Sequence, residues 1–287
     1  MEEEYVQCIL CNQDNTELAF KLTKNVIVVK CRDCGLMYQN PRRIDISYYD
    51  EKFFQSWIQR QDAQCRFCEN RFDSLLAIIR PGQILDIGCG TGEFLAVAQK
   101  RGGDCYGVDV SRWAANYANR FLKNEVRIGT VEDAKFPESF FDVVYSRATL
   151  EHYHNPLITM RETRRILKPG GLAILEVPDE KHLKAKMLIR DIIRGKYIPS
   201  EGEARQHLYF FTKESLCKVV RHAGFHIIQA KIEGWNSPPG RLLTFVRKIN
   251  WKMRILLWLI RLKIDVKVGL GNAILVIATP ATEAMGK

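Results

Sequence analysis

The stretch ILDIGCGTGEFLAV, residues 84–97, has three glycines between an apolar run and a helical pattern. A dinucleotide-binding turn has its third glycine where Glu93 stands, and a carboxylate there would repel a pyrophosphate. No Gly-Lys-Ser/Thr follows, which excludes a P-loop. Glycine lacks a Cβ, so the backbone can approach a ligand closely. Asp86, just before the turn, can accept a hydrogen bond from a cationic or hydroxyl-bearing ligand. The stretch therefore indicates a ligand held by backbone without a phosphate contact.

Three further segments follow in order: YGVDVS (106–111), FDVVYSRATLEHYHNP (141–156) and ILKPGGLAILEVP (166–178). With the glycine stretch, they resemble the motifs of class I S-adenosylmethionine-dependent methyltransferases. The resemblance implies an enzyme with an α/β fold: a Rossmann-like seven-stranded methyltransferase sheet, its last strand antiparallel, flanked by helices. The alternation of apolar runs and helical patterns after Pro81-Gly82 independently indicates parallel strands with helical crossovers.

The resemblance also implies a set of cofactor contacts. Asp109 would hold the ribose hydroxyls and Val110 would pack on the adenine. Many relatives have an aspartate where Thr130 stands, so we expect Glu132, Asp133 or backbone to read the adenine amine. Ser146 and Arg147 end the fourth strand near the methionine moiety, and Arg147 could instead face the acceptor. The full expected set is Asp86, Gly88, Cys89, Gly90, Gly92, Asp109, Val110, Val131, Glu132, Ser146 and Arg147.

Methyl transfer from a sulfonium is an in-line displacement, and a hydroxyl acceptor also needs a base. Histidine suits this role near neutral pH. His152 follows the fourth strand, where the family opens onto the methyl group, and Glu151 could orient it. His207 lies in a segment that contacts substrate in related enzymes, and His154 is a weaker candidate. For each of these histidines, a structural or exposed role is the alternative.

Two Cys-x-x-Cys pairs near the start, Cys8 with Cys11 and Cys31 with Cys34, match a structural four-cysteine zinc site. The alternative is reduced cysteines without metal. The continuation CGLMYQNPR (34–42) resembles the zinc-ribbon leader of many methyltransferases that act on sugars and secondary metabolites. A third pair, Cys65 and Cys68, lies in a helical pattern, and we interpret it as half-buried helix cysteines, with metal ligation as the alternative.

The predicted organisation is a zinc-ribbon-like module (1–45), a linking helical segment (46–80) and a methyltransferase domain (81–287). A basic amphipathic insertion occupies residues 241–268. We expect it to cap the site or contact a second subunit, with peripheral membrane contact as the alternative. No apolar run is long enough to span a bilayer and the N-terminus lacks a signal-peptide pattern, so we expect a cytoplasmic protein.

Charge is uneven along the chain: residues 1–180 carry a net −3 and residues 181–287 a net +13. The basic part suits an anionic partner, or is simply a solvated surface. We expect a small-molecule or lipid-linked glycan acceptor, methylated at a hydroxyl or carbon of a sugar, glycan precursor or secondary metabolite. The alternatives are an RNA methyltransferase and a non-enzymatic binding protein. SRATLEH at the end of the fourth strand differs from the Asn-Pro-Pro-Tyr type motif of base-amine methylation.

Overall fold

The computed structural model describes residues 3–43, 46–75, 78–79, 82–180, 204–233 and 273–281. The predicted basic insertion at 241–268 lies outside the described residues.

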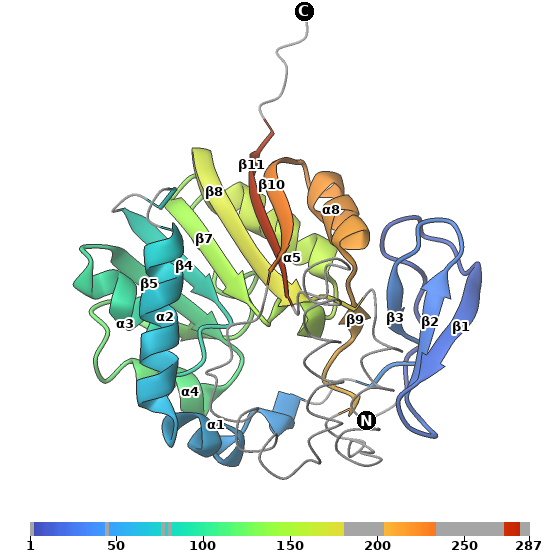
Figure 1. The fold of residues 1–287 in the computed structure, drawn as a ribbon, viewed down its shortest axis with the longest axis horizontal. Helices are drawn as coiled ribbons and strands as arrows, with labels where there is room; N and C mark the ends of the chain where they lie inside the picture. Colours follow the sequence, from blue (N-terminus) through green and yellow to red (C-terminus); the bar gives the residue numbers. More distant parts are fainter. Residues whose placement is uncertain are drawn as a thin grey trace, which may run out of the picture.

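A seven-stranded sheet forms the centre of the molecule (Figure 1). Its strands lie in the order β10-β11-β8-β7-β4-β5-β6, and β11 is antiparallel to both neighbours, whereas β8, β7, β4, β5 and β6 are parallel. The bounds are β4 (Gln83–Ile87), β5 (Asp104–Asp109), β6 (Val126–Ile128), β7 (Phe141–Arg147), β8 (Leu167–Pro178), β10 (Phe225–Glu233) and β11 (Ala273–Pro280). The predicted Rossmann-like sheet with an antiparallel last strand is confirmed.

Helices cover both faces of the sheet. Successive side chains of a buried strand point to opposite sides, so both faces carry apolar side chains that need to be covered. On one face, Ile84 packs with Phe72 of α2 and Leu95 of α3; on the other, Leu85 belongs to the cluster that contains Met160 of α5. The helices on the first face are α2 (Gln61–Leu75), α3 (Glu93–Lys100) and α4 (Arg112–Ala118). Those on the second are α5 (Pro156–Ile166) and α8 (Lys213–His222).

Local sequence fixes the helix ends. The Thr212 side chain accepts a hydrogen bond from the Ser215 amide and the Ser215 hydroxyl accepts one from the Thr212 amide, which closes a capping box at the start of α8. Gly224, with φ +86°, ends the same helix in the left-handed conformation. A threonine before the helix and a glycine after it are sequence signals for its two ends.

A second, four-stranded sheet joins the N-terminal module to a distant segment. It has the order β1-β2-β3-β9, in which β1 (Thr16–Lys21), β2 (Ile27–Cys31) and β3 (Met37–Gln39) come from the module. The fourth strand, β9 (Tyr209–Phe210), precedes α8 and pairs with β3 through Met37 and Tyr38. Figure 1 shows this sheet beside α8, separate from the central sheet. The division into 1–45, 46–80 and 81–287 stays a prediction.

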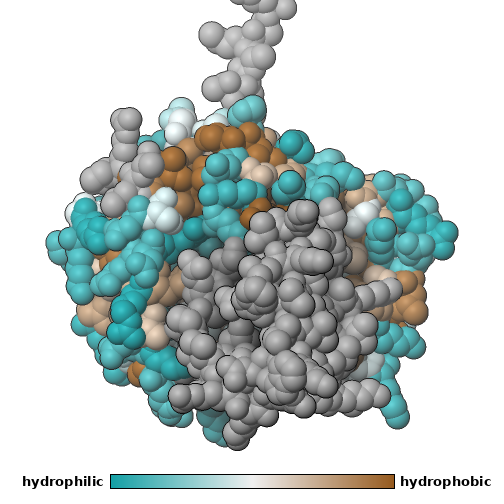
Figure 2. Space-filling view, in the orientation of Figure 1, coloured by the Kyte–Doolittle hydropathy of each residue, from teal (hydrophilic) through white to brown (hydrophobic). Residues whose placement is uncertain are grey.

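The segment after the module forms a short 3-10 turn, η1 (Ile46–Tyr48), and two helices, α1 (Glu51–Ile58) and α2. Cys68 is buried on α2 and Cys65 is partly buried, in line with their interpretation as helix cysteines. Hydrophilic residues cover much of the described surface in Figure 2, and hydrophobic residues gather over the upper ends of β8 and β11. No helix among the described residues is long and apolar enough to cross a membrane.

Candidate active site

The glycine turn leads from the end of β4 into α3. Gly88, Gly90 and Gly92 all have positive φ, at +72°, +54° and +85°. The Gly88 amide donates to the Val108 carbonyl at 2.8 Å, which ties the turn to the end of β5. A Cβ on Gly88 would lie 2.3 Å from Cγ2 of Thr149. Only glycine fits there, because the Thr149 side chain occupies the space that a Cβ would fill and the backbone has positive φ.

Asp109, at the end of β5, is held next to this turn. Its Oδ2 accepts from the Gly90 amide and its Oδ1 from the Ser111 amide, each at 2.8 Å. Burial raises the pKa of Asp109, while these two bonds favour the ionised form. Each carboxylate oxygen retains a lone pair, so the group can still accept from a ligand hydroxyl.

Buried acids make this edge suitable for a cationic ligand. Asp86 is 5% exposed, Glu93 6% and Asp109 7%. Burial, and then the negative charge of Asp109, raise the pKa of Asp86 well above its usual value. The Thr91 hydroxyl donates to Glu93 at 2.6 Å. A ligand with positive charge would relieve the mutual repulsion of these carboxylates.

Of the other expected cofactor residues, one lies in the core and several are held by contacts with neighbouring side chains. Val131 is fully buried in the core, and the Glu132 carboxylate accepts from the Thr159 hydroxyl at 2.7 Å. Asp133 closes a local turn by accepting from the amide and hydroxyl of Thr130. The Arg147 guanidinium lies 3.9 Å from the centroid of the Phe67 ring, and its Nε is 3.9 Å from Glu176. Three more expected residues lie at the strand ends: Cys89 and Ser146 are buried, and Val110 is partly exposed.

Three expected catalytic residues come together past the end of β7. Glu151 and His152 lie in the 3-10 turn η2 (Leu150–His152), and His207 lies just before β9. Possible ligand atoms of the three side chains all lie within 4.8 Å of one another. The two imidazole rings meet edge to face with centroids 4.8 Å apart. The backbone bond from the Leu208 amide to the Glu151 carbonyl, at 2.9 Å, holds the two segments together.

Burial shifts the pKa values of all three side chains in this cluster. It raises the pKa of Glu151 to about 8, and both carboxylate oxygens are buried without a hydrogen-bond partner. Burial lowers the pKa of His152, opposed by the carbonyls of Gln206 and Ala148, and it lowers the pKa of His207 to about 3, helped by His152. Both imidazoles are therefore neutral near pH 7, with lone pairs available.

The ring of His152 is oriented by backbone, not by Glu151. Its Nδ1 lies 2.6 Å from the Gln206 carbonyl, whereas its Nε2 is 3.8 Å from Glu151 Oε1, too far for a hydrogen bond. His154 points elsewhere, with its ring 2.9 Å from Arg42 and 3.1 Å from Glu4 of the N-terminal module. The cluster is thus Glu151, His152 and His207.

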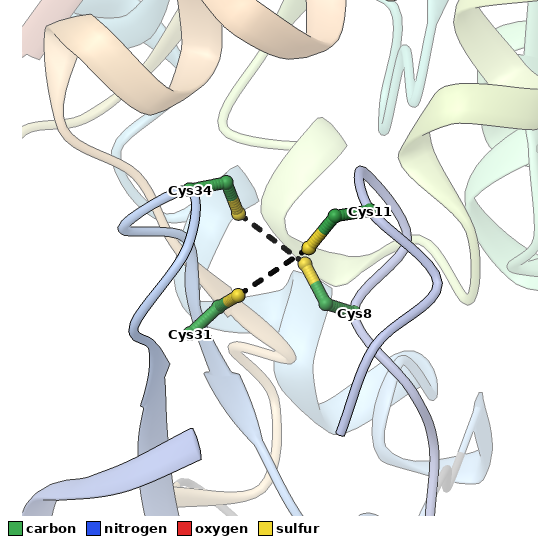
Figure 3. A group of neighbouring side chains, drawn as sticks. All are labelled: Cys8, Cys11, Cys31 and Cys34. Atoms are coloured by element: carbon green, nitrogen blue, oxygen red, sulfur yellow. Dashed lines mark hydrogen bonds between the residues drawn. The ribbon is translucent and has the colours of Figure 1, made fainter. Parts of the chain in front are cut away.

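The four N-terminal cysteines form a separate cluster. The Sγ atoms of Cys8 and Cys34 are 3.3 Å apart and those of Cys11 and Cys31 are 3.4 Å apart, with all four thiols pointing to one centre (Figure 3). These separations exceed a disulfide bond of ~2.05 Å. Sulfurs around a tetrahedral zinc with bonds of ~2.3 Å lie roughly 3.8 Å apart, so a small adjustment would fit the ion.

A family model described as a methyltransferase domain matches residues 46–230. The chain belongs to this methyltransferase family.

Relatives and solved structures agree with the family. The methyltransferase is 29% identical over 189 residues to a ubiquinone biosynthesis O-methyltransferase of Ruegeria pomeroyi, covering 60% of this chain and 72% of that protein. It is 30% identical over 173 residues to a phosphoethanolamine N-methyltransferase of Triticum aestivum, covering 53% of this chain but only 30% of that protein. A Thermotoga maritima S-adenosylmethionine-dependent methyltransferase, titled a possible histamine N-methyltransferase, shares the fold. Its TM-score is 0.54 at 20% identity, over 82% of this chain and 99% of that one.

The predicted class I S-adenosylmethionine-dependent methyltransferase is thereby confirmed, both as a fold and as an enzyme class. The methyl acceptors in these names are those of the relatives.

Sequence reasoning missed one part of the methyltransferase site: the segment around α1 covers the glycine turn. Phe54 lies 3.5 Å from the position of a Cβ on Gly90, and the Ser111 hydroxyl donates to the Tyr49 carbonyl at 2.6 Å. The Tyr49 ring is 6.0 Å from that of His152, centroid to centroid, and its hydroxyl is buried without a partner. The signal in the sequence was a run of aromatics, Tyr48, Tyr49, Phe53, Phe54 and Trp57, in what looked like a linker.

The N-terminal module forms a second part of the site that no motif indicated. Gln39, fully buried in β3, donates from its side-chain amide to the carbonyls of Ala204 and His207, at 3.0 and 2.6 Å. Arg42 donates to the His154 carbonyl at 2.8 Å. The module therefore supports the segment that carries His207.

Proposed function

We propose that this methyltransferase binds S-adenosylmethionine across the glycine turn and transfers its methyl group to a small molecule. The bound cofactor supplies an electrophilic methyl group on a sulfonium leaving group. In the proposed site, Gly88, Gly90 and Gly92 offer backbone to the cofactor, and Asp109 accepts from the ribose hydroxyls. Asp86 and the other buried acids complement its positive charge. Cys89, Val110, Val131, Glu132, Ser146 and Arg147 complete the proposed contact set.

The observation that carries the proposal on the acceptor is the cluster of Glu151, His152 and His207 beside the end of β7. A hydroxyl acceptor must lose its proton as the new bond to carbon forms, and the base must lie within reach of that hydroxyl. A neutral imidazole offers a lone pair for that proton, but a base works best with a pKa near the working pH, so the lowered pKa of about 3 counts against His207 as the base. We therefore favour a hydroxyl, or an acidic carbon, of a sugar, glycan precursor or secondary metabolite.

Within the cluster, His152 is the proposed base. The contact of Nδ1 with the Gln206 carbonyl, in which Nδ1 is the donor, leaves the Nε2 lone pair free to accept the acceptor's proton. His207 lies edge to face with this ring and is the proposed acceptor-positioning residue. Glu151 is buried beside both rings, and its pKa of about 8 leaves it mostly protonated near pH 7. A positive charge on His152 would favour its ionised form, which would in turn stabilise the imidazolium.

A structural zinc ion in the N-terminal module is the second part of the proposal. The convergence of Cys8, Cys11, Cys31 and Cys34 supports it (Figure 3). A module of this size has little core of its own, and metal binding would contribute to its folding free energy.

Two substitutions test the proposed roles. We expect His152→Ala to lower turnover by about 10²–10⁴-fold, the usual cost of losing a general base, and to leave cofactor affinity nearly unchanged. His207→Ala should raise the acceptor's Michaelis constant more than it lowers turnover. The assay is transfer of a labelled methyl group to a panel of sugar and phenolic acceptors, with calorimetry for the cofactor. His222→Ala, at an exposed histidine, is the control. Near-normal turnover in His152→Ala beside an inactive His207→Ala enzyme would reverse the two roles.

The alternative acceptor, RNA, has no specific observation in its favour among the residues that the structure describes. The basic segment that motivated it, and the suggested membrane contact through 241–268, lie outside them. Nucleic acid that copurifies with the protein and is methylated by it would favour this alternative over a small molecule.

A further inference from the structure

The cluster of Glu151, His152 and His207 contains a buried carboxyl group without a hydrogen-bond partner. Glu151 is 1% exposed, and neither of its carboxylate oxygens has a hydrogen-bond partner. A buried carboxylate without a partner is costly, and proteins usually compensate it with a cation, a proton or a donor. Its carboxylate lies within 4.8 Å of a nitrogen of each of two imidazoles, those of His152 and His207.

The orientation of His152 is that of a metal ligand. Its Nδ1 lies 2.6 Å from the Gln206 carbonyl, and its Nε2 is directed to the side of Glu151, at 3.8 Å from Oε1. A histidine that binds a metal through one nitrogen usually donates from the other to a carbonyl or carboxylate, which fixes its tautomer and ring direction. The backbone of the segment 204–207 supplies that carbonyl here.

We propose that Glu151, His152 and His207 bind one divalent transition-metal cation. Two imidazoles and one carboxylate suit zinc, manganese, iron(II) or cobalt(II) better than the harder magnesium or calcium. Ligand atoms at ~2.1 Å from a metal lie roughly 3.0–3.4 Å apart. The three side chains, now within 4.8 Å of one another, would need to move by about 1 Å. Three protein ligands leave coordination positions open for water or for an oxygen of a substrate.

This inference rests on the proposed function in one respect: both place the acceptor beside the same three side chains. The cation would use the Nε2 lone pair of His152, which is the same lone pair that would accept the proton. Metal binding and proton acceptance at His152 therefore exclude each other at any one moment, and the two have to be measured separately.

The test gives the metal-free full-length protein one equivalent of zinc, which the four soft thiolates bind first, and then adds cobalt(II). We expect one equivalent of cobalt to bind and to give weak visible bands without the intense thiolate charge-transfer bands of a cysteine site. Zinc measured before and after shows whether the cysteine site has been disturbed. Glu151→Gln should weaken cobalt binding by more than about 100-fold, since loss of an outer-sphere partner alone costs up to that much. His222→Gln, which removes an exposed histidine, should bind cobalt as the wild type does.

Two further measurements test the inference even if Glu151→Gln misfolds. The wild-type protein should unfold at a higher temperature with cobalt than without it, and Glu151→Asp, which keeps the charge, should retain part of that rise. The inference is overturned if the wild type takes up no cobalt beyond the cysteine site, if folded Glu151→Gln binds it as tightly, or if His222→Gln abolishes the binding. Methyl transfer by a wild-type protein that binds no cobalt would overturn the cation site alone. Cobalt binding without transfer to any acceptor would overturn the proposed function alone.

Discussion

The contact between the N-terminal module and His207 predicts that a residue far from the cofactor controls turnover. Gln39 is fully buried, and its side-chain amide donates to the carbonyls of Ala204 and His207. Gln39→Met keeps a similar volume and removes both donors. Its effect should appear at the segment 204–207, because the contacts that build the glycine turn do not involve Gln39.

The magnitude follows from the two carbonyls that lose a donor. A buried polar group left without a partner costs about 1–3 kcal/mol, so the two carbonyls together cost about 2–6 kcal/mol in the free energy of unfolding. The substitution also removes the Gln39 Oε1, which is buried without a partner, so we expect the net loss at the lower end of this range. A shift of the His207 ring by ~1 Å can cost about 10²-fold in turnover. Cofactor affinity should stay within about twofold of the wild-type value, because Gly88–Gly92 and Asp109 are untouched.

Urea unfolding and single-turnover methyl transfer would measure these effects. Gln55→Met is the matched control, since Gln55 is exposed on α1 and its amide donates to Glu51, its neighbour on the same helix, at 3.2 Å. The control should stay within about 0.5 kcal/mol of the wild type. Equal unfolding free energies and equal turnover for the two variants would refute the idea that this amide holds the His207 segment.

Three more predictions follow from single side chains. Asp109→Ala should weaken cofactor binding by about 10- to 100-fold, from the loss of about 1.5–3 kcal/mol of charged hydrogen bonding; unchanged affinity by calorimetry would refute the ribose assignment. Cys31→Ser should lower the zinc content, by elemental analysis, by one ion per chain, and zinc that leaves only in Cys65→Ser would mean a different ligand set. Gly88→Ala should destabilise the fold far more than Gly102→Ala. Both positions have positive φ, but only at Gly88 would the new Cβ meet a side chain, 2.3 Å away, and similar thermal unfolding of the two would contradict this.

The parts of the fold that the sequence predicts are those with local causes. The glycine turn needs positive φ at three positions, and the start of α8 needs Thr212 and Ser215 three residues apart. The antiparallel last strand came from the family resemblance. Pairing of β3 with β9 could not be predicted, because it joins Tyr38 to Tyr209 across most of the chain and neither segment carries a pattern for the other.

The same distinction holds for the candidate site. The position of Asp109 follows from its place at a strand end, and the nearness of His152 to that edge follows from the motif that contains it. The hydrogen bond that orients the His152 ring comes from a backbone carbonyl, and any residue type at position 206 could supply it. Tyr49 lies in a segment without a cofactor motif, so only the three-dimensional arrangement brings it to the site.

The shared sheet has a consequence for protein engineering. A small N-terminal module with four cysteines suggests a unit that could be deleted or exchanged between enzymes. Here, deletion would remove the partner strand of β9 and uncover the ring of Phe210, which packs edge to face on Phe20 at 5.3 Å. A truncated enzyme would expose an unpaired strand edge next to apolar side chains, an arrangement that promotes aggregation. Chimeras of this methyltransferase therefore need the module and the segment 204–211 transplanted as a pair.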